Sequence, residues 1–326
     1  MKNILVTGGA GYIGSHIIEI LLKKKINIFI ADNLLTGFKS LINKRAKFYK
    51  IDITNYKIIK EIINDNKIDT IIHLAASLSI NDSQKNPKIF YKNNVLGTKC
   101  LVKACKKSLV KNFIFSSTAA VYNDTLRKVN EKSIIKPKSI YGKTKKISEE
   151  IISKELKKNK INYAILRYFN VVGASPSNRI GPIKKNDTLF KNLSIEALKK
   201  KPVMKIYGDK LKTIDGTCIR DYIHVFDLST AHIQILEKIE KNKKSVTLNC
   251  GYGEGISVLE VINSFIKLTK KKVKIVVEKK RHGDLASSIA DNKKLKTFIK
   301  WRPKYKNLNK MVQSCLSWES KLNNKL

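Results

Sequence analysis

Short apolar runs separated by stretches of helical periodicity dominate the first half of the chain. The runs predict buried strands at 3–7, 26–31, 48–51, 70–74, 112–115 and 164–167. Between them, apolar residues recur at three- and four-residue spacing, which predicts helices over 12–24, 56–64, 87–106 and 139–158. Strands that alternate with helices in this way are typical of a parallel sheet with helices on its faces.

The pattern changes after residue 170, where proline and glycine become frequent and the apolar spacing becomes irregular. Residues 221–249 again look regular, so we expect the chain to return there to the first lobe. We predict an α/β protein with a doubly wound parallel sheet, a Rossmann domain, over residues 1–170. A smaller, irregular α/β lobe is expected over residues 171–326.

The formal charge of +40 raises the possibility of a nucleic-acid partner. Lysines are scattered along the whole chain, however, and only seven arginines occur. Phosphate and base recognition usually depends more on the planar fork of arginine. We therefore expect no dedicated nucleic-acid partner, only weak, salt-sensitive binding to polyanions. The abundance of Lys, Asn and Ile suggests the hypothesis of an AT-rich coding genome.

Neither a membrane span nor a metal centre is predicted. The chain has no run of 18 apolar residues, and its start lacks the features of a signal peptide, so a cytoplasmic location is expected by default. The five cysteines are odd in number, and no CxxC pair or close histidine pair occurs. These cysteines are predicted to be reduced thiols.

A glycine-rich loop follows the first predicted strand and opens the first predicted helix. Gly8, Gly11 and Gly14 form a GxxGxxG pattern. Glycines there let the backbone approach a pyrophosphate, and the N-terminus of the helix attracts its negative charge. A turn without a ligand is the alternative. Asp32, with Asn33 beside it, ends the second strand, and a carboxylate at that place favours NAD over NADP because it would repel a 2′-phosphate.

Eight motifs occur in order along nearly the whole chain, although each of them alone is weak. They are TGGAGYIGSH from residue 7, HLAA from 73, NNVLGT from 93, FSSTAAVY from 115, YGKTK from 141, RYFN from 167, GTCIRDYIHV from 216 and RHGD from 281. Together they resemble the UDP-glucose 4-epimerases of the extended short-chain dehydrogenase/reductase family. The resemblance implies an NAD-dependent enzyme of galactose metabolism that interconverts UDP-glucose and UDP-galactose.

Two Tyr-x-x-x-Lys pairs are present, and lysine is so common that about two are expected by chance. The pair Tyr56 and Lys60 lacks the family context, whereas Tyr141 and Lys145 have it. Residues i and i+4 share a helix face, so Lys145 is expected to depress the pKa of Tyr141 and to hold the nicotinamide ribose. Thr118 takes the place of a family hydroxyl that would hydrogen-bond the reacting sugar oxygen.

By the same resemblance, Tyr141 removes the proton of the sugar 4-hydroxyl while the C4 hydride passes to NAD. The 4-keto sugar then turns about its diphosphate link, and the hydride returns to its other face. NAD is regenerated in each turnover and should stay tightly bound.

The resemblance assigns further residues to the two ligands. Those at the cofactor are Tyr12, Ile13, Asp52, Ile53, Leu74, Ala75, Ala76, Asn93 and Phe169, besides Lys145. Those at the nucleotide sugar are Asn170, Tyr207, Arg220, Arg281, Asp284 and Ser288, besides Thr118. The arginines are expected at the diphosphate, Asp284 at the uridine ribose and Tyr207 near uracil. A surface salt bridge between Arg220 and Asp221 is the alternative, and His73 is expected to be structural.

Several positions depart from the family pattern. Ile140 replaces a common proline, Leu78 a polar or larger residue, Thr188 an asparagine and Ala286 a proline. The small Ser288 would leave room for an N-acetyl group, so 4-epimerisation of UDP-N-acetylglucosamine or UDP-glucuronate stays an alternative. Ala119 and Ala120 follow Thr118 where dehydratases carry an Asp-Glu pair, which disfavours dehydration.

Two further hypotheses concern partners. A cofactor-binding protein turned into a polyanion- or RNA-binding module is an alternative from a different class, motivated by the charge. The resemblance also implies a homodimer through the helices predicted over 87–106 and 139–158, although the lysines on them could weaken it. These are Lys92, Lys99, Lys103, Lys154 and Lys158.

Overall fold

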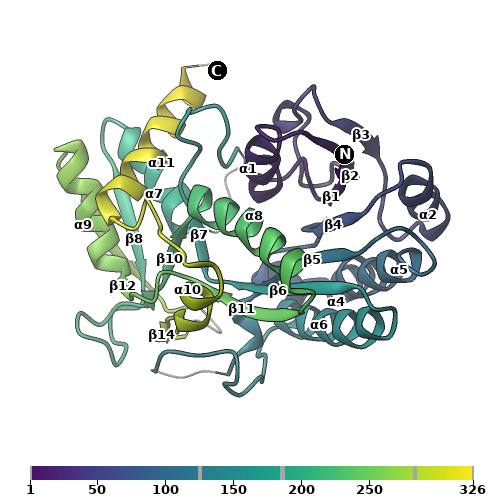
Figure 1. Ribbon diagram of the computed structural model, residues 1–326. Helices are drawn as coiled ribbons and strands as arrows, with labels where there is room; N and C mark the ends of the chain where they lie inside the picture. The colour runs from purple at the N-terminus through teal and green to yellow at the C-terminus, as the bar shows by residue number, and fades with distance from the viewer. Residues whose placement is uncertain (1, 124–126, 184–187, 282–284, 325–326) are drawn as a thin grey trace.

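A seven-stranded parallel sheet forms the centre of the chain in the computed structural model, which describes residues 2–123, 127–183, 188–281 and 285–324 (Figure 1). The strand order is β11-β6-β5-β4-β1-β2-β3. The strands are β1 (Lys2–Thr7), β2 (Ile26–Asp32), β3 (Lys47–Lys50), β4 (Thr70–His73), β5 (Asn112–Thr118), β6 (Asn162–Tyr168) and β11 (Val246–Cys250). The order reverses between β1 and β4, which opens a crevice at their carboxyl ends. The predicted doubly wound parallel sheet is confirmed.

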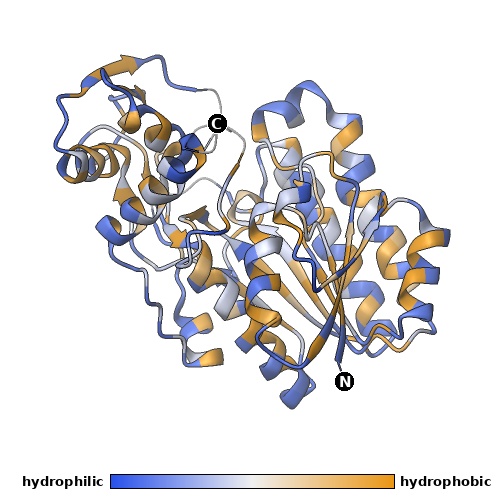
Figure 2. Cartoon of the chain, turned by 90° about the horizontal axis from the view of Figure 1, so that it is seen from above, coloured by the Kyte–Doolittle hydropathy of each residue, from blue (hydrophilic) through white to orange (hydrophobic). Residues whose placement is uncertain are grey.

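Helices cover both faces of this sheet. On one face lie α1 (Tyr12–Leu21) and α8 (Val225–Asn242), and on the other α2 (Tyr56–Asp65), α5 (Gly97–Ala104) and α6 (Ile140–Lys158). Successive β1 side chains point to alternate faces of the sheet. Ile4 and Val6 pack with α1 and α8, and Leu5 packs with α2, α5 and α6. Figure 2 shows the hydrophobic strands enclosed between helices whose polar residues lie on the outside.

The helix predicted over 87–106 is present as one helical stretch from residue 87 to 104, made of α4 (Pro87–Phe90), a π-helical turn η2 (Tyr91–Leu96) and α5. A short helix, α3 (Ile80–Lys85), precedes it. The π turn, which adds one residue to the repeat, was not predicted. The helix predicted over 12–24 is also shorter, because α1 ends at Leu21 and the chain turns there.

The remaining elements form a second group, at the left of Figure 1. The helices α7 (Leu189–Leu198), α9 (Val258–Thr269) and α11 (Leu308–Asn323) pack together, and β8 (Val203–Tyr207) pairs with β13 (Lys274–Glu278). Short strands link this group to the sheet: β7 (Asn170–Val172) with β10 (Tyr222–His224), and β9 (Ile219–Arg220) with β12 (Ile256–Ser257) and β14 (Ser287–Ser288). Two 3₁₀ turns, η1 (Lys39–Leu41) and η3 (Ala119–Val121), and α10 (Lys293–Ile299) complete the set. The division into two lobes stays a prediction.

All five cysteines are free thiols. Across the described residues, the search for a helix suited to crossing a membrane finds none, and no cluster of potential metal ligands is found in that part of the chain either.

Candidate active site

The glycine-rich loop between β1 and α1 is shaped by two different demands. Gly8 has a φ of +74°, and a Cβ there would lie 2.6 Å from the backbone N of Ala75; one on Gly14 would lie 2.4 Å from the Gly8 carbonyl O. Both glycines are thus required by packing. A Cβ on Gly11 would meet only the Gly8 carbonyl O, at 3.2 Å. Its absence leaves an open cradle at the N-terminus of α1, where a phosphate would fit.

Asp32 closes the adjoining edge of the loop. Its carboxylate oxygens accept hydrogen bonds from the backbone N of Ala10 at 3.0 Å and of Leu34 at 2.8 Å. Burial raises the pKa of Asp32, and these two hydrogen bonds oppose the rise. Asp32 therefore braces the glycine loop as well as standing at the end of β2.

A groove runs from this loop along the carboxyl ends of the strands. The structure places most of the predicted cofactor residues around it: Gly8, Gly11, Tyr12, Ile13, Gly14, Asp32, Asn33, Asp52, Ile53, Leu74, Ala75, Ala76 and Asn93. Leu35, Thr36, Ser77, Leu78 and Ser116 also line it. Phe169 is not among the lining residues, because it is buried in a small apolar cluster with Val121 and Tyr122. Its assignment to the cofactor stays a prediction.

Tyr141 and Thr118 meet where β5 ends and α6 begins. The Ser139 side chain caps α6 by accepting a hydrogen bond from Gly142 N at 3.0 Å, so the helix start does not depend on a proline at position 140. A Cβ on Gly142 would lie 2.3 Å from the Ala120 carbonyl O, so the helix starts directly against the end of β5. This close approach brings the Tyr141 side chain beside that of Thr118.

The acidity of Tyr141 differs from the prediction. Burial raises the pKa of Tyr141 to about 12, and the hydrogen bond with Thr118 opposes the rise. Lys145 is not among the causes of the shift, so the predicted depression by Lys145 is wrong for the chain by itself. Burying a phenol disfavours its charged form more strongly than one neighbouring side chain compensates.

Lys145 is almost completely buried, with 1% of its surface exposed. Its Nζ donates to the Ser116 carbonyl O at 2.8 Å and lies 4.8 Å from the centre of the Phe115 ring. Burial lowers the pKa of Lys145 to about 7, against the opposing charge of Glu149. Lys145, Tyr141 and Thr118 are not among the residues that line the groove, but Ser116, which accepts this hydrogen bond, is. The ammonium carries three N–H donors in all.

A buried ion pair holds α6 to the sheet behind this site. The Glu149 carboxylate accepts hydrogen bonds from Nε and Nη2 of Arg167, at 3.0 and 2.7 Å, and from the hydroxyl of Ser117. Arg167 also donates to the Tyr122 hydroxyl at 2.9 Å, which donates to Asn249 Oδ1 at 2.6 Å. Sequence reasoning missed this network, because its members come from four separate segments.

Two other polar groups support the strand ends. Both ring nitrogens of His73 are hydrogen-bonded to threonines, Thr7 at 2.8 Å and Thr98 at 2.9 Å, and burial lowers the pKa of His73 to about 3. This neutral, enclosed ring fits the predicted structural role. In the π-helical turn, Asn94 Oδ1 accepts a hydrogen bond from the backbone N of Ser77 at 2.7 Å, and Asn94 Nδ2 donates to the hydroxyl of Thr144 at 3.0 Å. These two hydrogen bonds join α6 to the groove.

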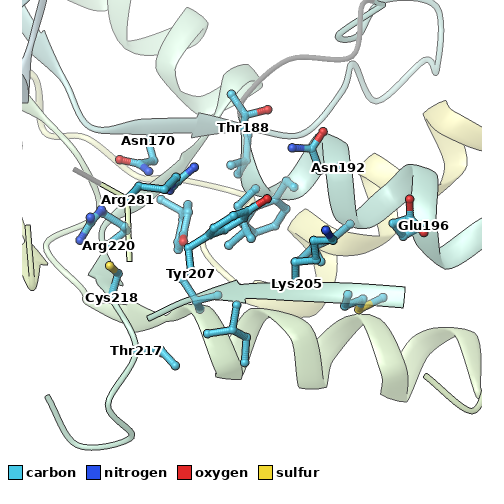
Figure 3. Close-up of a pocket in the computed structure, with 18 of the residues that line it drawn as sticks. Asn170, Thr188, Asn192, Glu196, Lys205, Tyr207, Thr217, Cys218, Arg220 and Arg281 are labelled. Carbon is cyan, nitrogen blue, oxygen red and sulfur yellow. The ribbon is translucent and has the colours of Figure 1, made fainter. Parts of the chain in front are cut away.

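A second pocket, of about 670 Å³, lies among α7, β8 and β9 (Figure 3). Five positions singled out from the sequence line it: Asn170, Thr188, Tyr207, Arg220 and Arg281. In Figure 3 the two arginines and Asn170 gather on one side, and Glu196 lies on the opposite side. Ser288 is not a lining residue, but it pairs with Arg220 between β14 and β9. Asp284 lies outside the described residues.

Asn192 was missed by sequence reasoning. It lines the pocket from α7, and among the described residues its buried Oδ1 has no hydrogen-bond partner. Nothing in the sequence around it distinguishes it from other surface amides, and only the fold brings it to the pocket.

A surface salt bridge between Arg220 and Asp221 is excluded. Asp221 is fully buried, and its carboxylate accepts hydrogen bonds from the backbone N of Tyr252 and Gly253, both at 2.8 Å, and of Ala290 at 3.1 Å. Burial raises the pKa of Asp221 to about 7, and these hydrogen bonds oppose the rise. Asp221 is therefore an internal anchor, whereas Arg220 faces the pocket.

Residues 4–251 match the model of the NAD dependent epimerase/dehydratase family, and this match covers the groove, α6 and the sheet. The chain belongs to the NAD-dependent epimerase/dehydratase family. The predictions of an enzyme, of NAD as its cofactor and of the Rossmann fold are confirmed by this membership.

Relatives within the epimerase/dehydratase family extend the similarity to the whole chain. The UDP-glucose 4-epimerase of Halalkalibacterium halodurans is 38% identical over 97% of this chain and 95% of its own length. A UDP-glucose 4-epimerase structure from Stenotrophomonas maltophila, with bound NAD and formylated UDP-arabinopyranose, has a TM-score of 0.95 at 31% identity and covers all of both chains. A UDP-Glc/GlcNAc 4-epimerase structure from Campylobacter jejuni has a TM-score of 0.85 at 37% identity, over 98% of this chain and 100% of its own.

Proposed function

We propose that the chain interconverts UDP-glucose and UDP-galactose by oxidising and then reducing C4 of the hexose. The observation that carries the proposal is the placement of Tyr141 beside Thr118, with Lys145 hydrogen-bonded to Ser116, which lines the groove. A binding protein has no need of such a set. The name shared by the curated relatives supports the same substrate pair.

The residues that line the groove suit the pyrophosphate and adenosine part of NAD. The open cradle at Gly11 and the N-terminus of α1 suit the pyrophosphate. The carboxylate of Asp32, which accepts a backbone hydrogen bond from Ala10, suits the adenosine ribose. Lys145 would hold the nicotinamide ribose with the N–H donors that face away from Ser116. When bound, the nicotinamide accepts the C4 hydride and gives it back.

Tyr141 is the proton carrier in this proposal. Its oxygen takes the proton of the sugar 4-hydroxyl and later returns it, so the residue ends each turnover unchanged. With a pKa of about 12 the side chain is almost entirely the protonated phenol at neutral pH in the chain alone, so the charge of the bound cofactor must favour the phenolate. The Thr118 hydroxyl donates a hydrogen bond to the same sugar oxygen and keeps that oxygen within reach of Tyr141.

The second pocket would hold the nucleotide end. Arg220 and Arg281 offer planar N–H forks to the diphosphate, and Asn170 lies beside them. A sugar tethered only through its diphosphate can turn over and present its other face to the groove. On this proposal, the second pocket fixes the nucleotide, and the chemistry takes place at the groove.

A second substrate class has support of its own. Ser288 is small and half-buried beside Arg220, which would leave room for an N-acetyl group. The Campylobacter jejuni neighbour, 37% identical, is described as a UDP-Glc/GlcNAc 4-epimerase. We therefore extend the proposal to UDP-N-acetylglucosamine, and expect Ser288→Tyr to lose that activity while it keeps activity on UDP-glucose.

The deciding experiment incubates the pure protein with UDP-galactose and follows the appearance of UDP-glucose. Tyr141→Phe is the control and should lower kcat by about 10²- to 10⁴-fold while bound NAD is retained. UDP-N-acetylglucosamine and UDP-glucuronate are tested in parallel. The proposal fails if the wild-type protein carries NAD but does not turn over UDP-galactose, or if Tyr141→Phe remains fully active.

A further inference from the structure

The hydroxyl of Tyr12 joins the groove to the second pocket. Tyr12 lines the groove as the first residue of α1, yet its hydroxyl donates a hydrogen bond to the Gly173 carbonyl O at 2.6 Å, 161 positions further along the chain. Gly173 directly follows β7, and all three residues of β7 line the second pocket. A side chain of the groove is therefore bonded to the end of a strand that forms the pocket wall.

Both atoms of this hydrogen bond are enclosed by the fold. Burial raises the pKa of Tyr12 well above its ordinary value, so the hydroxyl keeps its proton at neutral pH and acts as a donor. Gly173 is buried as well. A buried carbonyl that loses a donor pays the cost of its desolvation, or the backbone moves to find another partner. The Tyr12 hydroxyl thus helps to fix where β7 ends.

Gly173 is held at a second point by His224. It has a φ of +94°, and a Cβ there would lie 2.2 Å from His224 Nε2, so the imidazole packs directly on the glycine. The imidazole is completely buried and stacks on Tyr305 with 4.3 Å between ring centres. Its Nε2 is hydrogen-bonded to the Ser314 hydroxyl at 3.0 Å. With the imidazole fixed in this way, a displacement of the Gly173 carbonyl is passed on to β7.

We propose that Tyr12 is a positioning residue for the substrate: through Gly173, its hydroxyl sets the place of β7 and so of the pocket wall that carries Asn170. The inference rests on the proposed nucleotide-sugar substrate. It adds a role on the substrate side to a residue that the family resemblance assigns to the cofactor. The two roles use different atoms, because the N-terminus of α1 offers backbone N–H groups to a pyrophosphate, whereas Gly173 takes the side-chain hydroxyl.

The test measures the binding of UDP to the NAD-loaded protein by calorimetry. Tyr12→Phe removes only the hydroxyl, and is expected to weaken the binding of UDP about 2- to 10-fold, the range of one hydrogen bond, while bound NAD is retained. Wild-type affinity for UDP in Tyr12→Phe would overturn the inference. Loss of NAD from Tyr12→Phe would assign the hydroxyl to the cofactor and overturn it too.

Tyr49→Phe is the matched control. The Tyr49 hydroxyl donates to Asn66 Oδ1 at 3.0 Å from β3, and Tyr49 lines neither the groove nor the second pocket. Both variants lose one hydroxyl hydrogen bond, so urea denaturation should show similar losses of stability, whereas Tyr49→Phe should bind UDP like the wild type. An equal loss of UDP affinity in Tyr49→Phe would contradict a specific role of Tyr12.

A double-mutant cycle checks that the effect passes through Gly173. Ser314→Ala frees the His224 ring and should also weaken the binding of UDP. Since both changes act on the same glycine, the combined loss should be smaller than the product of the two separate losses, and independent losses would refute the path. In turnover, Tyr12→Phe should raise KM for UDP-galactose more than it lowers kcat, a split that general destabilisation would not produce.

The outcomes separate this inference from the proposed function. A wild-type protein that binds UDP and shows the predicted variant pattern, but epimerises nothing, would leave the Tyr12 role standing and remove the proposed reaction. A protein that epimerises UDP-galactose while Tyr12→Phe binds UDP like the wild type would do the reverse. A wild-type protein that binds no UDP would remove both.

Discussion

Replacing Lys145 with methionine should abolish activity and yet stabilise the protein. The ammonium is 1% exposed, and burial lowers its pKa from 10.5 to about 7. At 1.36 kcal/mol per pKa unit, this displacement corresponds to about 5 kcal/mol of lost stability at low pH. Deleting the charge should recover most of it, less about 1 kcal/mol for the hydrogen bond to Ser116.

The stabilisation expected from Lys145→Met depends on pH. Below pH 7 the amine is protonated in both the folded and the unfolded chain, so the full cost of the buried charge is present. Between about 7 and 10.5 only the unfolded chain holds the proton, and the free energy of unfolding rises with pH. The stabilisation by Lys145→Met should therefore be about 4 kcal/mol near pH 6 and about 1 kcal/mol near pH 9.

The assay is urea denaturation of protein stripped of dinucleotide, at both pH values. Lys60→Met is the matched control, because Lys60 also follows a tyrosine by four residues, with its Nζ 6.0 Å from the Tyr56 ring, but is exposed on α2. It should change stability by less than about 0.5 kcal/mol. If Lys145→Met gives the same change at both pH values, or destabilises at pH 6, the argument from burial is refuted.

Three further outcomes are expected. Gly14→Ala should lower the melting temperature markedly, since its Cβ would lie 2.4 Å from the Gly8 carbonyl O, whereas Gly11→Ala should fold normally and lose NAD on gel filtration. Glu149→Ala leaves Arg167 buried without its carboxylate, so the free energy of unfolding should fall by about 3–5 kcal/mol, and much less if Arg167→Met is added. Binding to heparin, driven by the charge of +40, should be lost on raising the salt concentration with no effect on turnover of UDP-galactose; turnover that needs the polyanion would contradict this.

Local patterns predicted the elements around the groove well. Gly8, Gly11 and Gly14 lie within seven residues at the loop and first turn of α1, and the alternation of strands and helices fixes where that loop lies in the sheet. Tyr141 and Lys145 likewise belong to one helix turn. Such features depend on neighbours in sequence, so spacing together with the surrounding motif is enough to find them.

Features that depend on distant pairings could not be predicted in this way. The three N–H groups that bind the Asp221 carboxylate belong to Tyr252, Gly253 and Ala290, from segments joined only by the fold. The acidity of Tyr141 could not be predicted either, because burial, the largest cause of its shift, is a property of the packed structure. The sequence shows which groups are adjacent along a helix, but not how deeply the fold buries them from solvent.

The position of Asp221 bears on how a sugar could turn while its nucleotide stays fixed. Its backbone N donates to the Ser288 carbonyl O at 3.0 Å, and its own carbonyl O accepts from Asn170 N at 3.0 Å. Together with the bonds to its carboxylate, these contacts tie Arg220 to the strand ends of the sheet. On the proposed mechanism, the distance from the diphosphate anchor to Thr118 then stays constant, and rotation is confined to the bonds between sugar and phosphate. A looser anchor would let the whole ligand shift, and C4 would move out of reach of Thr118 and Tyr141.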